Sequence, residues 1–269
     1  MSRPTRTRRP RLIPPSKTNT RLMKPDATSL NLIKTGDGSM SLYHAALDET
    51  YHSRHGAIAE SQHVFIQSGL SHWLDQAQAR LMGQQPEDIS ILEMGFGTGL
   101  NALLTRLYQV DIGGGISSNE IAATDEISIH YQSLEAYPLL PQIYESLAYS
   151  DSIGCDPELF LSLHKAPWNQ KVAIASDFSL TKNKMRFEDF SASQAYDLVY
   201  YDAFGARVQP ELWEMERFLI LHKALRKHGV LVTYAAKGSV RRALQEVGFA
   251  IERLPGPPGK REMLRGTKI

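Results

Sequence analysis

The fold of this protein is decided by Ile91-Leu-Glu-Met-Gly-Phe-Gly-Thr-Gly-Leu-Asn101, an apolar run followed by three alternate glycines and the start of a helical pattern. This order predicts a strand, a tight turn and a helix. Glycine has no Cβ, so Gly95, Gly97 and Gly99 allow positive φ and a close approach of a ligand to the backbone. The helix that follows offers unpaired N–H groups at its start. The stretch therefore predicts a cofactor-binding turn.

The type of cofactor is indicated by Glu93, which lies two residues before the first glycine, at the end of the expected strand. A carboxylate there would repel a pyrophosphate but suits a cationic amino-acid group, so S-adenosylmethionine fits better than NAD. The spacing Glu-x-Gly-x-Gly-x-Gly also differs from the Gly-x-Gly-x-x-Gly of dinucleotide-binding folds. Glycine-rich turns also join strands to helices where no ligand binds, and for this stretch alone that interpretation stays open.

Length and composition indicate one large α/β domain with appendages, since the chain has 269 residues of which 42% are hydrophobic. The basic N-terminal segment has no continuous apolar run and contains several prolines, so we expect no membrane span, signal peptide or transit peptide. We therefore expect a cytoplasmic protein. Cys155 is the single cysteine and the nine histidines show no His-Glu-x-x-His pattern, so we expect no metal site.

Charge is distributed unevenly, although the formal net charge is only +1. Residues 1–24 carry eight Lys or Arg and no acid, and the chain from Lys223 onward carries eleven against three acids. The middle keeps eleven basic and twenty-six acidic residues. Basic segments of this kind often contact phosphate backbones, and a solvated tail is the alternative for residues 1–24.

We divide the sequence into three parts. Residues 1–28 are rich in Pro, Arg, Thr and Ser and lack a hydrophobic period, so we predict a disordered basic tail. Residues 29–85 are expected to form an N-terminal extension, with a hairpin around Gly36-Asp-Gly38 and a helical pattern over 60–81. Residues 86–269 are expected to form the main α/β domain.

Beyond the glycine turn, strand and helix patterns alternate, as in a doubly wound α/β fold. We expect the stretch around Pro157 and Pro167 to be less regular, and 111–126, with three consecutive glycines, to form a loop. The expected strands cover 127–135, 171–176, 178–181, 196–201 and 229–234. The expected helices cover 100–110, 141–149, 210–225 and 240–247, and a closing antiparallel pair covers 249–254 and 261–264.

Acidic side chains are expected at the carboxyl ends of four strands, where open α/β sheets bind their ligands. Glu93 ends the first strand, and Glu135 ends the second as the candidate ligand of the ribose hydroxyls. Asp189 takes a later position that often holds an adenine amino group, and Asp202 follows the strand over 196–201. Packing does not readily explain four acids at one sheet edge, so we expect a ligand site there.

Six segments, taken in order, resemble a known family. They are Glu60–Phe65, Gly95–Asn101, Ser133–Leu139, Tyr201–Phe204 with Pro210 and Trp213, Val240–Phe249, and Gly259–Leu264. The family is the methyltransferase domain of the bifunctional tRNA 5-methylaminomethyl-2-thiouridine biosynthesis protein MnmC, with its stand-alone form MnmD. The resemblance runs from about Gly36 to Gly266. The resemblance does not include the flavin oxidase half of the bifunctional protein. Residues 1–28 of this sequence have no counterpart in the family.

The resemblance implies a class I S-adenosylmethionine-dependent methyltransferase with a Rossmann-like, seven-stranded sheet. It implies transfer of a methyl group to the 5-aminomethyl nitrogen of the wobble (2-thio)uridine in tRNA, which gives 5-methylaminomethyl-(2-thio)uridine. The implied partners are the anticodon region of tRNA and enzymes that install the aminomethyl group, with no membrane and no metal.

Pattern and resemblance together assign roles to residues. Asp202 would orient the substrate amine and balance its developing charge, because a carboxylate of ordinary pKa is a poor base for an ammonium. Tyr201 and Tyr234 could face the substrate, with core packing as the alternative for Tyr201. The expected cofactor ligands are Glu93, Gly95, Gly97, Gly99, Asn101, Glu135 and Asp189. The expected substrate or RNA contacts are Tyr51, Glu60 and Phe204, with Arg241, Lys260 and Arg261 on phosphates.

Two other classes of function stay open. A small-molecule amine transferase on the same fold, such as a polyamine aminopropyltransferase, also sets strand-end acids against a cationic amine. The basic C-terminal segment argues against a cationic substrate. A non-catalytic RNA-binding module with a relic pocket is the other class, which the intact Glu93, Glu135 and Asp202 disfavour.

Overall fold

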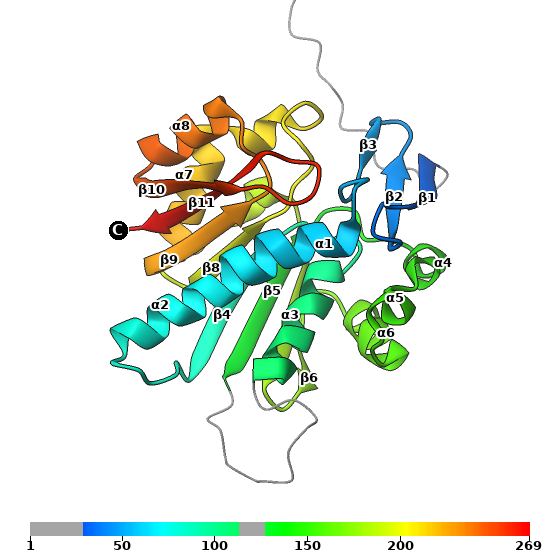
Figure 1. Cartoon of the computed structure of the whole chain (residues 1–269), viewed down its shortest axis with the longest axis horizontal. Helices are drawn as coiled ribbons and strands as arrows, with labels where there is room; N and C mark the ends of the chain where they lie inside the picture. Colours follow the sequence, from blue (N-terminus) through cyan, green and yellow to red (C-terminus); the bar gives the residue numbers. More distant parts are fainter. Residues whose placement is uncertain (1–28, 113–126) are drawn as a thin grey trace, which may run out of the picture.

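An eight-stranded mixed sheet runs through the computed structural model, which describes residues 29–112 and 127–269 (Figure 1). The strand order is β10-β11-β9-β8-β4-β5-β7-β6. The strands are β4 (Asp88–Met94), β5 (Ser128–Glu135), β6 (Lys171–Ala175), β7 (Phe178–Lys184), β8 (Tyr196–Tyr201), β9 (Leu225–Thr233), β10 (Phe249–Pro255) and β11 (Glu262–Lys268). The predicted tail over 1–28 and most of the predicted loop over 111–126 lie outside the described residues.

The doubly wound α/β fold is confirmed, since β7, β5, β4, β8 and β9 run parallel and neighbour one another in that order. The expected closing hairpin is present, with β11 antiparallel to β9 and β10 antiparallel to β11. The sheet has eight strands in the described residues instead of the expected seven. The number seven came from the resemblance. The strand predicted over 171–176 is present as β6, which pairs antiparallel with β7 and forms the opposite edge.

Two apolar cores lie on the two faces of the sheet because side chains alternate along each strand. Ile89 and Ile91 of β4 face one core, whereas Leu92 and Met94 face the other. The first core is covered by α1 (Ala57–Ser61), η2 (Gln62–Ser71), α2 (His72–Arg80), α3 (Leu100–Ile112) and α6 (Pro157–Lys165). The second is covered by α7 (Met215–Ala224) and α8 (Gly238–Glu246), with the 3₁₀ turns η4 (Phe187–Asp189) and η5 (Pro210–Trp213).

The helix predicted over 60–81 is present as one rod, α1-η2-α2, that crosses the sheet (Figure 1). Its middle is π-helical, which nothing in the apolar spacing indicates. Gly69 lets the rod approach the strands, because a Cβ there would lie 3.0 Å from Val232 Cγ2. Val64, Phe65 and Leu70 belong to the same core as the sheet, so the core crosses the sequence division at residues 85 and 86.

A small three-stranded sheet precedes the rod and contains the predicted hairpin. Its strands are β1 (Leu30–Lys34), β2 (Met40–His44) and β3 (Glu49–Thr50). Asp37, in the turn between β1 and β2, accepts a hydrogen bond from the Ala59 N–H with Oδ2 at 2.9 Å. This bond satisfies an N–H of the first turn of α1 and so fixes the hairpin against the rod.

Two helix predictions were wrong in their bounds, and one helix was missed. The helix expected over 141–149 is instead α4 (Pro141–Tyr144), η3 (Glu145–Leu147) and α5 (Tyr149–Ile153), broken where Ala148 takes a φ of 48°. The helix over 210–225 is divided at Glu214, whose ψ of 157° is extended. The stretch around Pro157 contains α6, because Asp156 caps the Glu158 N–H at 3.0 Å and proline suits a first helical turn.

Candidate active site

The glycine turn follows β4 as predicted, and Gly95, Gly97 and Gly99 all have positive φ, of 95°, 49° and 73°. The Gly95 N–H donates to the carbonyl oxygen of Leu134 at 2.9 Å. The Gly97 N–H donates to Oε2 of Glu135 at 3.0 Å. These bonds join the ends of β4 and β5, so the turn is held open by its neighbouring strand.

Two histidines that were not expected at the site, the buried His52 and the half-buried His164, both contact Thr98 in the turn. The ring Nε2 of His52 lies 2.7 Å from Thr98 Oγ1, and that of His164 donates to the Thr98 carbonyl at 3.0 Å. Burial lowers the pKa of His52 to about 4 and that of His164 to about 3, so both rings are neutral near pH 7. His164 also closes the space beside Gly99, where a Cβ would lie 2.7 Å from Nε2.

Glu93, two residues before the turn, is fully buried. Neither of its carboxyl oxygens forms a hydrogen bond in the described part of the chain. Burial raises its pKa to about 8, and the neighbouring side chains of Ser133 and Asn101 partly oppose this shift. Asp202 raises it further. Direct contact between Glu93 and a cofactor stays a prediction.

Asp202 follows β8 and lies against the glycine turn, since a Cβ on Gly95 would come within 3.3 Å of the Asp202 carbonyl oxygen. Asn101 Nδ2 donates to Asp202 Oδ2 at 2.8 Å, so Asn101 orients the candidate catalytic carboxyl, and its contact with a cofactor stays a prediction. Burial and the charge of Glu60 raise the pKa of Asp202 to about 7, while Asn101 and Lys260 lower it. Our expectation of an ordinary carboxyl pKa was therefore wrong.

The backbone after Asp202 is fixed by two aromatic side chains. The Tyr234 hydroxyl donates to the Ala203 carbonyl at 2.8 Å, and the Trp213 indole N–H donates to the Phe204 carbonyl at 2.8 Å. Tyr201 is fully buried and its hydroxyl donates to a backbone carbonyl, so core packing is the role the structure gives it. The loop that carries Asp202 is thus held by the second core.

A cavity of about 680 Å³ opens beside this loop and is assembled from segments far apart in the sequence. The first segment is β3 with the residues after it, and the others are the starts of α1 and α8, the loop after β8 and the β10–β11 turn. The lining residues used below are Tyr51, Glu60, Phe204, Tyr234, Lys237, Lys260 and Arg261. The sequence analysis expected five of them as substrate contacts, considered Tyr234 as a sixth, and missed Lys237.

Tyr51 links the glycine turn to the cavity. A Cβ on Gly97 would lie 3.3 Å from Tyr51 Cδ1, so the ring packs directly on the turn. The same ring meets Phe204 edge to face with their centroids 5.0 Å apart. Burial raises the pKa of the Tyr51 hydroxyl, and the charge of Glu135 adds to this shift. The N-terminal extension therefore contributes an aromatic wall where cofactor and substrate would meet.

The predicted phosphate contacts differ in their surroundings. Lys260 is paired inside the cavity, with Nζ 2.5 Å from Glu60 Oε2 and 3.8 Å from the centre of the Tyr234 ring. Its contact with phosphate stays a prediction. Arg261 is exposed and lines the cavity, whereas Arg241 is half-buried on α8 and does not line it. Lys237 is exposed at the same mouth.

Asp189 does not end a strand. It lies exposed on the 3₁₀ turn η4, five residues after the end of β7 at Lys184. The turn forms because Asp189 N–H bonds to the Arg186 carbonyl at 3.1 Å. Contact between Asp189 and an adenine group stays a prediction.

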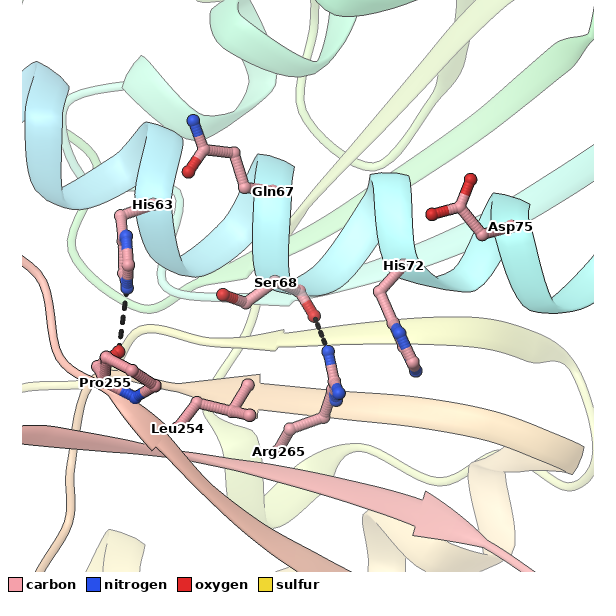
Figure 2. A pocket seen from close by; sticks show the side chains of 8 residues that line it. All are labelled: His63, Gln67, Ser68, His72, Asp75, Leu254, Pro255 and Arg265. Carbon is pink, nitrogen blue, oxygen red and sulfur yellow. Dashed lines mark hydrogen bonds between the residues drawn. The ribbon is translucent and has the colours of Figure 1, made fainter.

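A second cavity, of about 340 Å³, lies between the helical rod and the β10–β11 hairpin (Figure 2). Figure 2 shows two of its side chains bonded to backbone carbonyls: His63 to Pro255 at 2.8 Å and Arg265 to Ser68 at 3.3 Å. Arg265 also binds both carboxylate oxygens of Glu252 at 3.0 Å. His63 and Arg265 therefore join the rod to the hairpin across this cavity.

Comparisons with known proteins agree with this geometry. Residues 165–269 match the model of a family described as S-adenosyl-L-methionine-dependent methyltransferase. The tRNA 5-methylaminomethyl-2-thiouridine biosynthesis bifunctional protein MnmC of Nitrosospira multiformis is 28% identical over 84% of this chain and 35% of its own length. The protein of the same name from Aromatoleum aromaticum is 30% identical over 82% of this chain and 33% of its own length.

The chain is thus similar to the MnmC proteins, and its C-terminal part matches an S-adenosyl-L-methionine-dependent methyltransferase family. The chain spans about a third of the length of these curated relatives. Two solved structures share its fold. MnmC2 from Aquifex aeolicus has a TM-score of 0.63 and 22% identity, covering 88% of this chain and 70% of that one. Spermidine synthase from Thermotoga maritima has a TM-score of 0.51 and 9% identity, covering 89% and 68%.

S-adenosylmethionine is the cofactor of this methyltransferase family, and the residues present fit it. The three positive-φ glycines leave alternate positions of the turn without side chains, and Glu135 bonds the Gly97 N–H at its edge. Asn101 Oδ1 is buried without a partner among the described residues, as expected of a group awaiting a ligand or water. In the described ranges no helix is long and apolar enough to span a membrane, and no three His, Cys, Asp or Glu side chains form a metal-binding group.

Proposed function

We propose that this protein transfers a methyl group from S-adenosylmethionine to the 5-aminomethyl nitrogen of the wobble (2-thio)uridine in tRNA. The observation that carries this proposal is Asp202, a half-buried carboxyl beside the glycine turn, followed directly in the chain by Ala203 and Phe204, which line a cavity large enough for a nucleoside. The relatives' printed name, which contains 5-methylaminomethyl-2-thiouridine, supplies the substrate class. Because the chain spans a third of these relatives, only the methyl-transfer step is proposed for it.

S-adenosylmethionine, when bound, supplies a sulfonium-activated methyl group that an amine can displace. The chain's contribution is to align the amine with that methyl group and to exclude water. Asp202 would accept a hydrogen bond from the amine and balance the positive charge that develops on nitrogen. With its pKa raised to about 7, Asp202 is also a better proton acceptor than an ordinary carboxylate.

Aromatic side chains would shape the space where the two ligands meet. Tyr51 packs on Gly97, and Phe204 meets Tyr51 edge to face, so both rings border the line from turn to cavity. A ring face beside a sulfonium contributes about 0.5–2 kcal/mol through cation–π attraction. We assign Tyr51 and Phe204 to this border.

The mouth of the cavity suits a nucleic acid. Arg261 and Lys237 are exposed there, and Arg241 lies on the adjacent helix α8. Their charges would bind phosphates on either side of the modified nucleotide. Since tRNA is modified where it is used, we place the protein in the cytoplasm, downstream of enzymes that install the aminomethyl group.

A polyamine transferase is the second candidate on this fold. Polyamines carry several positive charges, and the cavity contains Lys260 in its wall and Arg261 at its mouth. Like charges in a half-buried space would oppose such a ligand. The arrangement therefore favours an amine attached to an anionic nucleic acid.

The test is nucleoside analysis of tRNA from a strain that lacks this protein, with and without its restoration. We expect 5-aminomethyl-(2-thio)uridine to accumulate in the deletion strain and 5-methylaminomethyl-(2-thio)uridine to return on restoration. Restoration with Asp202→Asn should leave the unmethylated nucleoside. An unchanged nucleoside profile in the deletion strain would remove the proposed function.

A further inference from the structure

Lys260 is the half-buried lysine among the two that line the substrate cavity in the described part of the chain, and its backbone is fixed. It lies in the turn Pro255-Gly-Pro-Pro-Gly-Lys260 between β10 and β11. A Cβ on Gly256 would lie 2.5 Å from the Lys260 carbonyl oxygen, and a Cβ on Gly259 would lie 2.0 Å from His55 Cδ2. The Lys260 N–H also bonds to the Pro257 carbonyl at 2.9 Å. The turn thus holds Lys260 in one place against the N-terminal extension.

The ammonium of Lys260 is held by two further groups. Glu60 is 6% exposed at the side chain and accepts from Lys260 Nζ through Oε2 at 2.5 Å. Its other oxygen, Oε1, accepts from the Ser53 N–H at 2.8 Å, which fixes the carboxylate. The face of Tyr234 lies 3.8 Å from Nζ. Glu60 and Tyr234 therefore aim the ammonium.

The same ammonium keeps donor capacity toward the cavity. An ammonium has three N–H donors, and Glu60 is the one hydrogen-bond partner of Nζ among the described residues. The Lys260 side chain is 32% exposed and lines the cavity. A lysine can donate but never accept a hydrogen bond. A ligand group that meets it must therefore be an acceptor.

A pyrimidine with an aminomethyl group at C5 presents such a group beside the reacting nitrogen. In uracil the neighbouring C4 carries a carbonyl oxygen, which accepts hydrogen bonds, whereas in cytosine it carries an amino group, which donates. Asp202 would hold the amine, and Lys260 is close enough to Asp202 for its charge to act on that carboxyl. A base whose amine lies at Asp202 would therefore turn its C4 substituent toward the Lys260 side of the cavity.

We propose that Lys260, aimed by Glu60 and Tyr234, donates a hydrogen bond to the C4 carbonyl of the substrate base and thereby selects uracil over cytosine. This assignment rests on the proposed function and names the base that the same cavity accepts. A site that hydrogen-bonds a substrate group rejects an analogue that cannot form the bond, because its own polar group is left unpaired. Lys260 is thus a specificity-determining residue for the nucleobase.

The experiment uses two synthetic anticodon stem-loop RNAs that differ only at the wobble base, one with 5-aminomethyluridine and one with 5-aminomethylcytidine. The measured quantity is kcat/KM for methyl transfer from S-adenosylmethionine. Wild type should prefer the uridine RNA. Lys260→Met should lower kcat/KM on the uridine RNA by about 10- to 100-fold, the value of a hydrogen bond to a charged donor. The rate on the cytidine RNA should stay the same or rise.

Because Lys260→Met leaves the buried Glu60 without its cation, the double variant Glu60→Gln with Lys260→Met removes both charges and should show the same loss of selectivity. Cofactor binding by calorimetry reports that each variant is folded. Lys227→Met, an exposed lysine near the start of β9, is the matched control and should keep the wild-type preference.

The outcomes separate the two proposals. A wild type that methylates neither RNA overturns the proposed function and the Lys260 assignment with it. A wild type that methylates both RNAs equally leaves the function standing and overturns the selectivity. Equal losses of kcat/KM on both RNAs in the Lys260 variants would overturn the selectivity and show that the Lys260–Glu60 pair only joins the β10–β11 hairpin to the helical rod. An unchanged kcat/KM on the uridine RNA would show that Lys260 does not touch the base.

Discussion

The glycine turn and the substrate cavity lie side by side, yet they are built in opposite ways. The turn is one continuous stretch, and its shape depends on the positive φ of Gly95, Gly97 and Gly99. The cavity is assembled from segments between Glu49 and Glu262 that meet only after folding. A cofactor site made of backbone can therefore be predicted from one continuous stretch of sequence. A substrate site made of side chains depends on contacts between distant segments. If the two regions are separable, variants in one should spare the other.

The largest effect is expected from the cavity side. Asp202→Asn keeps the shape of the side chain and its contact with Asn101 but removes the negative charge that would balance the amine. The rate of methyl transfer in single-turnover assays should fall by about 10²-fold or more, the size seen when one preorganised electrostatic partner is lost. Cofactor affinity should change little.

The matched control is Asp151→Asn, an exposed residue on α5, which should transfer methyl groups at the wild-type rate. If Asp202→Asn kept the wild-type rate, Asp202 would be structural. If the variant lost cofactor binding instead, the turn and the cavity would not be separable at this residue.

The next effect concerns the histidine that supports the turn. Burial lowers the pKa of His52 to about 4 from 6.5, with the charge of Glu60 opposing the shift. Between pH 6.5 and pH 4 the unfolded chain binds a proton at His52 that the folded protein does not. The contribution of His52 to the free energy of unfolding should therefore be fully present above pH 6.5 and be lost as the pH falls toward 4. The loss at pH 4 should be about 3 kcal/mol from His52 alone.

Urea unfolding at several pH values checks this prediction. His52→Asn should show a shallower fall in the free energy of unfolding between pH 6.5 and pH 4 than wild type. The control is His228→Asn, because His228 is exposed and its φ of 66° suits asparagine. Identical pH dependence in His52→Asn and wild type would contradict a buried neutral ring at Thr98.

A smaller effect is expected at the glycine turn, which is the cofactor side of the site. Glu135→Ala removes the expected ribose ligand and the acceptor of the Gly97 N–H. Cofactor affinity measured by calorimetry should weaken by ~1.5–3 kcal/mol, the value of hydrogen bonds to a charged group. The methyl-transfer rate at saturating cofactor should stay within a few-fold of wild type. Glu145→Ala, on an exposed turn, is the control, and an unchanged affinity in Glu135→Ala would remove its assignment.

The smallest effect is expected from two arginines near the mouth of the cavity, Arg261 in its lining and Arg241 on the adjacent helix α8. Arg241→Ala with Arg261→Ala should weaken tRNA binding and flatten its salt dependence by roughly one unit of slope for each lost phosphate contact. The control Lys171→Ala with Lys227→Ala removes two exposed cations elsewhere. Filter binding across a salt series measures both. A slope equal to wild type in the first pair would show that these arginines do not contact phosphate.

The parts that the sequence predicted are those that short-range patterns control. The strand, glycines and helix over 91–101 were identified because alternation, positive φ and helix starts act within a few residues. Glu135 and Asp202 followed from the rule that parallel strands end at one edge. Asp189 was misplaced because the chain turns into η4 after β7 ends.

What the sequence could not predict depends on contacts between distant segments. His52 and His164 both meet Thr98, and neither has a local pattern that distinguishes it from a surface histidine. Lys260 appeared to be a surface cation in a Pro-Gly turn until folding brought it to Glu60, 200 residues earlier in the chain. Glu60 itself was expected because it opens a helix within a polar cluster, though its partner was not.

We propose that the protein, through its glycine turn and its substrate cavity, methylates an amine on uridine. The direct measurement is transfer of labelled methyl from S-adenosylmethionine to an anticodon stem-loop with 5-aminomethyluridine at the wobble position, followed by digestion and mass analysis of the nucleosides. The account predicts label in 5-methylaminomethyluridine and nowhere else in the RNA, with the loss in Asp202→Asn described above. Cofactor binding without any transfer, or label on another nucleoside, would contradict it.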